Sequence, residues 1–162
     1  MLACDRFAGK IFSDRYGNAA FPHYQNGTVC GLELKNAKRG LLVKGSRKSF
    51  WRSNTRTKDT TVVVTEAVID ALSYQQLFQP ADAFYLASGG GVSANQCRLL
   101  SDLLAEMTQI TKVIIATDND QGGDRIAKRV LEAIHRSSFR GQAVRHRPIR
   151  DGEDWNDALR CN

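Results

Sequence analysis

The stretch from Val113 to Arg125 reads VIIATDNDQGGDR, and it decides the fold. An apolar run stands directly before three aspartates and two adjacent glycines, and a buried core would not accept that much charge. The run therefore predicts a buried strand with a polar loop at its carboxyl end. Gly122 and Gly123 allow a sharp backbone turn and predict that the next helix opens there.

The alternation of strand and helix extends over the whole second part of the chain. From Thr60 onward, TTVVVTE, AFYLAS and KVIIATDND are unbroken apolar runs typical of strands buried on both faces, and QAVRHRP adds a fourth strand. The intervening stretches have helical spacing, for example Leu99, Leu103 and Met107. This pattern predicts an α/β fold with a mainly parallel sheet flanked by helices.

The first part of the chain has a different pattern. Short β-like runs (GKIFSD, AAFPHY, TVCGLELK and LLVK) alternate with the turn signals YGN, QNG and KRG. They predict a small antiparallel meander. We therefore expect two units, a β-rich N-terminal segment at residues 1–58 and an α/β domain at residues 59–162.

Composition limits the class of protein. A chain of 162 residues with 42% hydrophobic content suits one domain with a small appendage. It has no apolar run of the roughly 20 residues that a membrane span needs, so we expect a cytoplasmic protein without a membrane partner. The four cysteines include no CxxC pair, which argues against a zinc ribbon or a disulfide framework.

Acidic residues follow the predicted strands. Ligands of such sheets bind at the carboxyl ends of the strands, where Glu66 follows the first run and Asp70 stands one helical turn later. Asp118 and Asp120 follow the third run, and Asp154 lies beyond the fourth. Carboxylates converging from separate strand ends would repel one another unless a divalent cation neutralised them. Because all the candidate ligands are oxygen donors, the predicted ion is Mg²⁺, with Mn²⁺ as a substitute.

Other interpretations of the aspartates were weighed against the metal site. Aspartate often caps a helix, and for Asp124 we favour that role. An EF-hand loop starting at Asp118 fails, because Gly122 and Arg129 occupy positions that need oxygen ligands. A phosphotransferase that uses the first aspartate as its nucleophile stays open, although that pair usually follows the first strand, where Glu66 stands.

A basic segment precedes the α/β part. From Lys35 to Lys58 there are nine Lys or Arg residues and no Asp or Glu, which predicts contact with a polyanion. The predicted nucleic-acid-binding residues are Lys44, Arg47, Lys48, Trp51 and Arg52. Trp51 would stack on a base. The alternative is a solvated hairpin face with Phe50 and Trp51 as a buried aromatic pair.

A lone Glu after one strand and DxDxxG after a later one resemble the signature of the Toprim domain. Toprim domains occur in bacterial primases, topoisomerases, recombination-repair proteins and some nucleases. The resemblance covers about Thr60 to Arg160, and its nearest form is the primase-like branch found on plasmids and other mobile elements. It rests on VVVTEAVIDALS, YLASGGGVSANQ, ATDNDQGGDRIA and GEDWNDAL. DRYGNAAFPHYQNGTVCGLELKN is similar to the β-rich segment that precedes Toprim in those proteins.

The resemblance also implies roles for single residues. Glu66, Asp118 and Asp120 would form the catalytic, metal-binding set, with Asp70 and Asp154 as supporting ligands. Lys44 or Lys48 would touch substrate phosphates. Three residues depart from the family pattern: Ala67 replaces a glycine, Asn156 a carboxylate and Glu153 a lysine.

The function implied is Mg²⁺-dependent nucleotidyl or phosphoryl transfer on nucleic acid, most simply primer synthesis in the replication of a mobile element. Single-stranded DNA or RNA and nucleoside triphosphates would be the partners, with a helicase or a zinc-binding domain outside this chain. Glu66 would be a metal ligand or the general acid/base. The alternatives are a Toprim nuclease and a non-catalytic nucleic-acid-binding module.

Overall fold

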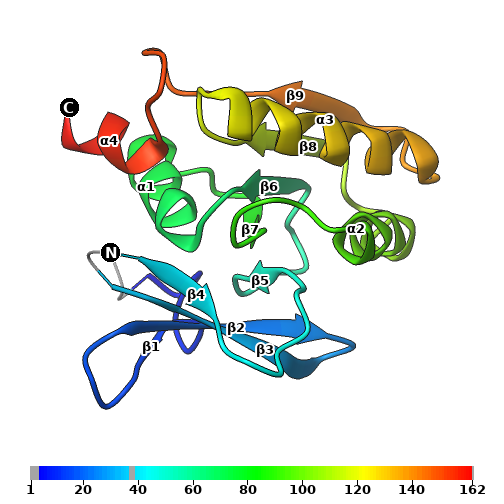
Figure 1. The fold of residues 1–162 in the computed structure, drawn as a ribbon. Coiled ribbons are helices and arrows are strands. Elements are labelled where there is room, and N and C mark those ends of the chain that lie inside the picture. Colours follow the sequence, from blue (N-terminus) through cyan, green and yellow to red (C-terminus); the bar gives the residue numbers. More distant parts are fainter. Residues whose placement is uncertain (1–3, 37–38, 162) are drawn as a thin grey trace.

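The first sheet is an antiparallel meander. A computed structural model describes residues 4–36 and 39–161 of the chain (Figure 1). The order in this sheet is β1-β2-β3-β4. Its strands are β1 (Phe12–Ser13), β2 (Ala19–Gln25), β3 (Thr28–Lys35) and β4 (Gly40–Leu42). The predicted N-terminal antiparallel segment is confirmed, and in the view of Figure 1 it lies below the rest of the molecule.

The second sheet carries the α/β part, with strand order β5-β7-β6-β8-β9. Its strands are β5 (Trp51–Arg52), β6 (Thr61–Thr65), β7 (Ala83–Ala87), β8 (Lys112–Ala116) and β9 (Gln142–Arg145). Strands β6 to β9 are parallel, and β5 pairs antiparallel with β7. The predicted fold class is confirmed. Because β5 precedes residue 59, the second sheet already begins within the basic segment.

The helices cover both faces of the second sheet. They are α1 (Val68–Phe78), α2 (Ala94–Glu106), α3 (Gln121–Arg136) and α4 (Trp155–Arg160). Because side chains alternate along a strand, Val62 and Val64 of β6 pack with α2 and α3, whereas Val63 packs with α1 and α4. The apolar runs that predicted buried strands therefore contribute side chains to two separate hydrophobic cores, one on each face of the sheet.

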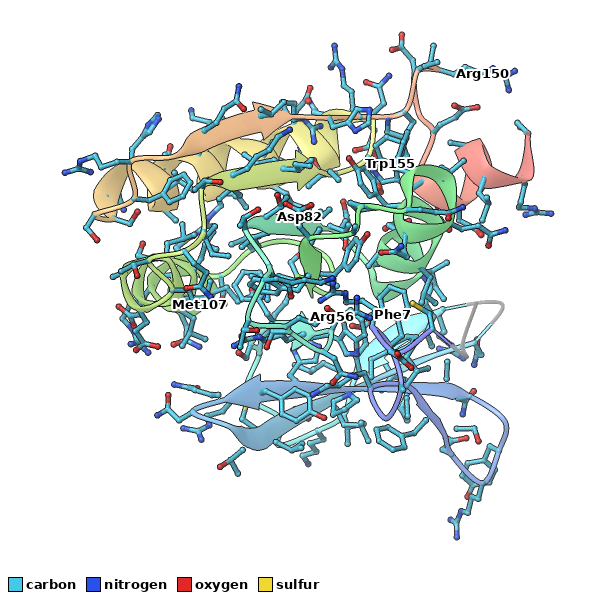
Figure 2. All side chains as sticks on the ribbon, turned by 180° about the vertical axis from the view of Figure 1, so that it is seen from behind. Phe7, Arg56, Asp82, Met107, Arg150 and Trp155 are labelled. Carbon is cyan, nitrogen blue, oxygen red and sulfur yellow. The ribbon has the colours of Figure 1, made fainter. Side chains whose placement is uncertain are left out.

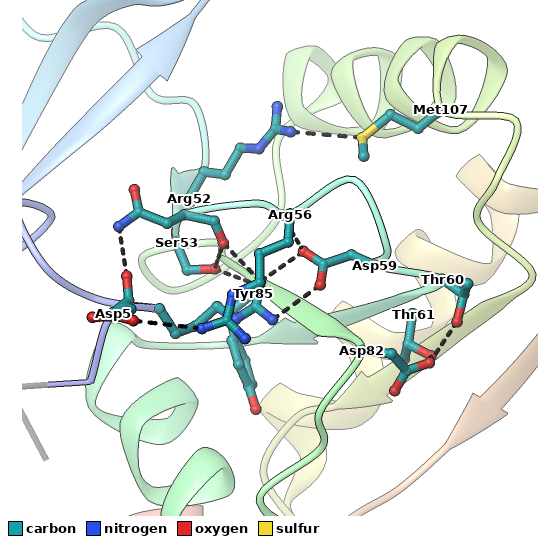
Figure 3. Close-up of polar contacts among 12 residues, drawn as sticks. Asp5, Arg52, Ser53, Arg56, Asp59, Thr60, Thr61, Asp82, Tyr85 and Met107 are labelled. Atoms are coloured by element: carbon teal, nitrogen blue, oxygen red, sulfur yellow. Dashed lines mark hydrogen bonds and ion pairs between the residues drawn. The ribbon is translucent and has the colours of Figure 1, made fainter.

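The N-terminal residues are anchored on the second of these cores. Phe7 stacks on Trp51 with a centroid distance of 6.0 Å and lies 5.5 Å from the Tyr85 ring. Figure 2 shows Phe7 between the two sheets. Arg6 and Asp59 form a bidentate ion pair with N–O distances of 2.6 and 2.9 Å, and both side chains are buried (Figure 3). These contacts fix the first sheet against the α/β part.

Helices α2 and α3 are amphipathic, whereas α1 is apolar on most of its faces and α4 is short. Within residues 4–36 and 39–161, none of them combines the length and the apolar character needed to span a bilayer.

Candidate metal centre and nucleic-acid interface

Glu66 and Asp118 come from neighbouring strands at the same edge of the second sheet. Strands β6 and β8 pair in register, with Thr65 opposite Ala116, so the residues that follow them leave the sheet side by side. A cavity of about 740 Å³ opens at this edge. It is lined by Glu66, Asp70, Asp118 and Asp154 together with basic residues of the first sheet. We call it the acidic cavity.

Asp118 is the electrostatic centre of the acidic cavity. Its Oδ1 atom is buried and accepts no hydrogen bond from any described residue. Burial, followed by the charges of the neighbouring carboxylates, raises the pKa of Asp118 to about 8. These neighbours are Asp70, Glu66, Asp154 and Asp120. The predicted convergence of carboxylates therefore takes place around this side chain.

Asp70 and Glu66 share this environment but have partners. Asp70 is 3% exposed, and its Oδ2 accepts a hydrogen bond from the Ala67 N–H at 2.9 Å, at the start of α1. Burial raises the pKa of Asp70 to about 7. Burial, then the charge of Asp120, raises the pKa of Glu66, whereas a hydrogen bond with Asp118 and the charge of Lys48 lower it. The Asp70 carboxylate thus both starts a helix and faces the site.

The loop after β8 contains one capping aspartate, and it is not the predicted one. Asp120 caps α3 by accepting a hydrogen bond from the Gly123 N–H at 2.6 Å. The predicted cap, Asp124, is wrong, because α3 begins at Gln121 and places Asp124 inside its first turn. Asp124 instead pairs with Arg145 at 3.3 Å. Asp120 is exposed and does not line the acidic cavity, although its charge raises the pKa of Glu66 and of Asp118.

The glycines after Asp120 lie close to the loop that carries Asp118 and Asp120. A Cβ added at Gly123 would overlap the backbone carbonyl of Asp118, so only glycine lets the helix start this close to the strand end. Arg145 braces the same loop by donating to the carbonyl oxygens of Thr117 and Asp118 at 3.1 and 3.0 Å. The position of Asp118 is therefore set by its close backbone contact with Gly123 and by the hydrogen bond from the Arg145 guanidinium.

The segment 152–155, which precedes and begins α4, is hydrogen-bonded to Asn119 in the loop after β8. The Asn119 N–H donates to the Glu153 carbonyl at 3.0 Å, and its carbonyl accepts from Gly152 at 2.7 Å. Trp155 donates to the Ala116 carbonyl at 3.0 Å, which holds Asp154 near the end of β8. Glu153, one of the family departures, pairs with Arg150 at 3.2 Å. Its negative charge is thus partly neutralised by a neighbour.

A glycine loop and a lysine complete this edge. The N–H groups of Gly89 and Gly90 donate to the Glu66 carbonyl at 2.9 and 3.2 Å, and both glycines have positive φ angles. Lys48 Nζ donates to the Gly91 carbonyl at 2.6 Å. Burial lowers the pKa of Lys48, and the charges of Glu33 and Glu66 oppose that shift. Lys48 therefore places a cation beside the carboxylates.

The predicted nucleic-acid set does not form one surface. Lys44 and Arg47 are exposed, Lys48 faces the acidic cavity, and Arg52 faces a different cavity. The base-stacking prediction for Trp51 is wrong in this fold, because its side chain is 0% exposed and its Nε1–H donates to the Lys10 carbonyl at 2.8 Å. The alternative of a buried aromatic residue describes Trp51.

Sequence reasoning missed three residues of the first sheet that line the acidic cavity, namely His23, Glu33 and Lys35. His23 accepts a hydrogen bond from Ser49 N–H at its Nδ1, so its Nε2 carries the proton in the neutral form and lies 3.5 Å from Glu33 Oε2. The two-residue spacing of Glu33 and Lys35 put them on one face of β3. Nothing in the sequence indicated that this face would meet the α/β part.

The donor set suits a hard divalent cation. Among the residues that the structure describes, no three or more His, Cys, Asp or Glu side chains are gathered as a metal-binding group. The carboxylates nevertheless share one cavity, and the buried Asp118 Oδ1 lacks a donor. Oxygen donors and mutual repulsion are what Mg²⁺ or Mn²⁺ would relieve. The residues therefore fit such an ion in chemistry, without a preformed coordination shell.

Comparison with known proteins identifies the family. Residues 63–159 match the Toprim-like family, which is more than half of the chain. The chain belongs to this family. The match includes Glu66, Asp118, Asp120 and Asp154, whereas some residues that line the acidic cavity, among them Lys35 and Lys48, precede the matched region. No curated protein matches the chain in sequence.

Solved primase structures have the same fold. A DNA primase domain from Pseudomonas aeruginosa is 16% identical with a TM-score of 0.58, and the match covers 96% of this chain and 53% of that one. The primase fragment of the bacteriophage T7 primase-helicase protein is 17% identical with a TM-score of 0.52, covering 91% and 60%. A bacteriophage T7 structure of lagging-strand DNA polymerase with two gp4 primase domains, an RNA/DNA hybrid and dTTP gives 21% identity and a TM-score of 0.57, covering 91% and 74%. The chain thus spans little more than half of the first two relatives.

Proposed function

We propose that the chain carries out divalent-metal-dependent nucleotidyl transfer on nucleic acid, of the kind that synthesises primers. The observation that carries the proposal is the buried Oδ1 of Asp118, which accepts no hydrogen bond from any described residue, in a cavity where its carboxyl group meets that of Glu66. A fully buried carboxylate oxygen without a donor is unfavourable in a purely structural role, so its retention indicates a ligand. Membership of the Toprim-like family supports the same interpretation.

Glu66, Asp118 and Asp120 would hold the ion, with Asp70 and Asp154 as supporting ligands. When bound, Mg²⁺ or Mn²⁺ would neutralise phosphate oxygens and align the attacking and leaving oxygens. Asp70 and Asp120 also accept helix-capping hydrogen bonds, which fixes their carboxylates before any ion arrives. The protein thus preorganises the negative charge that the reaction needs.

Two cations at the acidic cavity suit the phosphates of a substrate. Lys48 is held by the Gly91 carbonyl, and Lys35 lies close enough for its charge to lower the pKa of Glu66 and Asp70. Lys44 and Arg47 are exposed and would contact a nucleic-acid strand by neutralising its backbone phosphates. The partners proposed are single-stranded nucleic acid and nucleoside triphosphates, with a helicase or zinc-binding domain supplied by another part of the replication machinery of a mobile element.

The test is incubation of the protein with Mg²⁺ or Mn²⁺, ribonucleoside triphosphates and single-stranded DNA. New oligonucleotides support primer synthesis. A shortened template would instead indicate a nuclease, and retention of an unchanged template would indicate a binding module.

A matched pair of variants ties the activity to the site. Asp118→Asn should abolish product formation, because it removes the central carboxylate while keeping the shape of the side chain. Glu132→Gln removes an exposed carboxylate of α3 outside the acidic cavity and should leave the rate unchanged. Equal rates for the two variants would refute the proposed site.

A further inference from the structure

A second cavity, of about 750 Å³, lies between the β2–β3 turn, the residues after Lys48 and helix α2. One wall separates it from the acidic cavity, since Lys48 lines the acidic cavity whereas Ser49 and Phe50 line the second. Ser49 fixes this wall: its hydroxyl donates to the Tyr24 carbonyl at 2.7 Å, and its carbonyl accepts from Gln96 Nε2 at 2.8 Å. The two cavities are therefore distinct.

The second cavity lies on the α2 side of the molecule. Met107, which lines it, and Trp155, at the start of α4 beside the acidic cavity, lie toward opposite sides in Figure 2. The carboxylates proposed to bind metal, all of them within the described residues, do not line the second cavity. A ligand bound there would not depend on the metal site.

Two half-buried cations, Lys10 and Arg52, line the second cavity. Among the described residues, neither has a carboxylate oxygen within 4.0 Å. Burial lowers the pKa of both side chains, and the charge of Arg52 lowers the pKa of Lys10 further. The two cations therefore repel each other, and the two carboxylates that also line this cavity, Asp102 and Glu106, form no ion pair with either of them.

The N–H donors of Lys10 and Arg52 make few hydrogen bonds to the described residues. The Arg52 guanidinium lies over the Phe84 ring at 5.1 Å, and its Nη2 is 3.6 Å from Met107 Sδ (Figure 3). A thioether is a weak acceptor for a group with five N–H donors. Lys10 Nζ lies 4.6 Å above the Tyr24 ring. Aromatic faces hold both cations in place while most of their hydrogen-bonding capacity stays available.

The acidic residues of α2 leave these cations unneutralised. Asp102 is bound by Arg98 at 2.9 Å, on the exposed face of the helix. Glu106 raises the pKa of Arg52 through its charge but lies beyond ion-pair distance. An anion entering the cavity would therefore meet Lys10 and Arg52 as its strongest partners.

We propose that the second cavity binds a nucleotide, with Lys10 and Arg52 contacting its phosphate. Phosphate oxygens match the geometry of a guanidinium and accept charge-assisted hydrogen bonds. The base would lie against the apolar side chains of α2, Leu99, Leu103 and Met107, which line the same cavity. The phosphate belongs either to a free nucleotide or to one residue of a strand. This site does not rest on the proposed metal-dependent activity.

Calorimetric titration of the full chain in excess chelator tests the site, because the chelator removes any divalent ion from the acidic cavity. The probes are pyrophosphate, ATP and a short single-stranded oligodeoxynucleotide. We expect binding, weakened about tenfold or more by Lys10→Gln and by Arg52→Met, since each removes a charge-assisted contact. Lys58→Gln removes an exposed cation of the same basic segment, outside both cavities, and should bind as the wild type does.

The outcomes separate the sources of phosphate. Variant-sensitive binding of ATP or pyrophosphate supports a site for a free nucleotide, and variant-sensitive binding of the oligonucleotide alone supports a site for a strand. Wild-type affinity for every probe in Lys10→Gln, or no binding of any probe to the wild type, overturns the proposal. Arg52 also packs on Phe84, so thermal melting accompanies Arg52→Met, and Lys10→Gln decides if that variant does not fold.

Discussion

Asp59 and Asp118 both have buried carboxylate oxygens, but the surroundings of the two side chains are opposite. Asp59 is 0% exposed, and its carboxylate accepts two hydrogen bonds from the Arg6 guanidinium and a third from the Arg56 N–H at 2.7 Å. Asp118 is also drawn into the protein, but its buried Oδ1 has no donor among the described residues, and its neighbours are other carboxylates. One carboxylate is fully satisfied, whereas the other is not.

The Arg6–Asp59 pair has the surroundings of a structural ion pair, whereas those of Asp118 are typical of a ligand-binding carboxylate. A buried ion pair that satisfies all its hydrogen bonds can tie two segments together, as Arg6 and Asp59 tie the N-terminal residues to the start of the α/β part. A cluster of like charges destabilises the fold unless something outside the chain neutralises it. A proton or a cation would therefore stabilise the carboxylates of the acidic cavity, whereas the charges of Arg6 and Asp59 neutralise each other.

The largest expected effect comes from breaking the satisfied pair. Asp59→Ala leaves the buried Arg6 guanidinium without a counter-ion, with the Asn54 carbonyl as its remaining acceptor, and should lower the free energy of unfolding by about 3–5 kcal/mol. Asp5→Ala is the matched control, because Asp5 and Arg56 are 4.0 Å apart and exposed, and that change should stay within about 1 kcal/mol. Urea denaturation measures both. Similar losses for the two variants would remove the contrast between the regions.

A second effect concerns the backbone that presents Asp118. A methyl group at position 123 would overlap the Asp118 carbonyl, so Gly123→Ala should destabilise the protein by roughly 1–3 kcal/mol and displace the loop. At Gly122 the added carbon would lie 3.1 Å from a carboxylate oxygen of Asp120, a contact that a side chain can relieve. Thermal melting and Mn²⁺ titration should therefore show a larger loss for Gly123→Ala. Equal behaviour would mean that the loop is not tightly positioned.

A third effect is the pH dependence of the metal-free protein. The pKa of Asp118 is raised in the fold to about 8, so the protonated carboxyl favours the folded state. Its contribution to stability is present below its ordinary pKa of 3.8 and is lost as the pH rises through about 8. Between about pH 5 and pH 9, the wild type should lose roughly 1–4 kcal/mol more unfolding free energy than Asp118→Asn, where the lower figure allows for solvent screening of this partly exposed carboxyl.

Chemical denaturation in chelator at several pH values checks this expectation, with Glu132→Gln as the exposed control. Added Mg²⁺ should flatten the wild-type curve, because the ion replaces the proton as the neutralising charge. A parallel loss in the wild type and Asp118→Asn would show that Asp118 does not titrate in the cluster.

The sequence predicted the parallel sheet and the residues at its edge because both depend on local pattern. Apolar runs predicted β6, β7 and β8, and parallel strands bring their carboxyl ends together. Glu66 and Asp118 therefore needed no knowledge of tertiary contacts to be placed side by side. The prediction for Asp124 was wrong because the helix starts at Gln121, so the capping position falls on Asp120, four residues before Asp124.

The remaining features depend on long-range packing. An aromatic residue inside a basic segment has the same local pattern whether it is exposed or buried, and Trp51 is buried because Phe7 packs against it from a distant part of the chain. His23, Glu33 and Lys35 reach the acidic cavity only because one face of the meander packs on the α/β part. Local periodicity gives that face but not its partner.

Metal binding by Asp118→Asn and Glu132→Gln tests the central claim most directly. Calorimetric titration of the full chain with Mn²⁺ at about pH 8 should show binding by the wild type and by Glu132→Gln, and at least roughly tenfold weaker binding by Asp118→Asn. The same affinity in all three proteins, each checked for folding by thermal melting, would contradict the account, because the unpartnered carboxylate would then have no role in holding the ion.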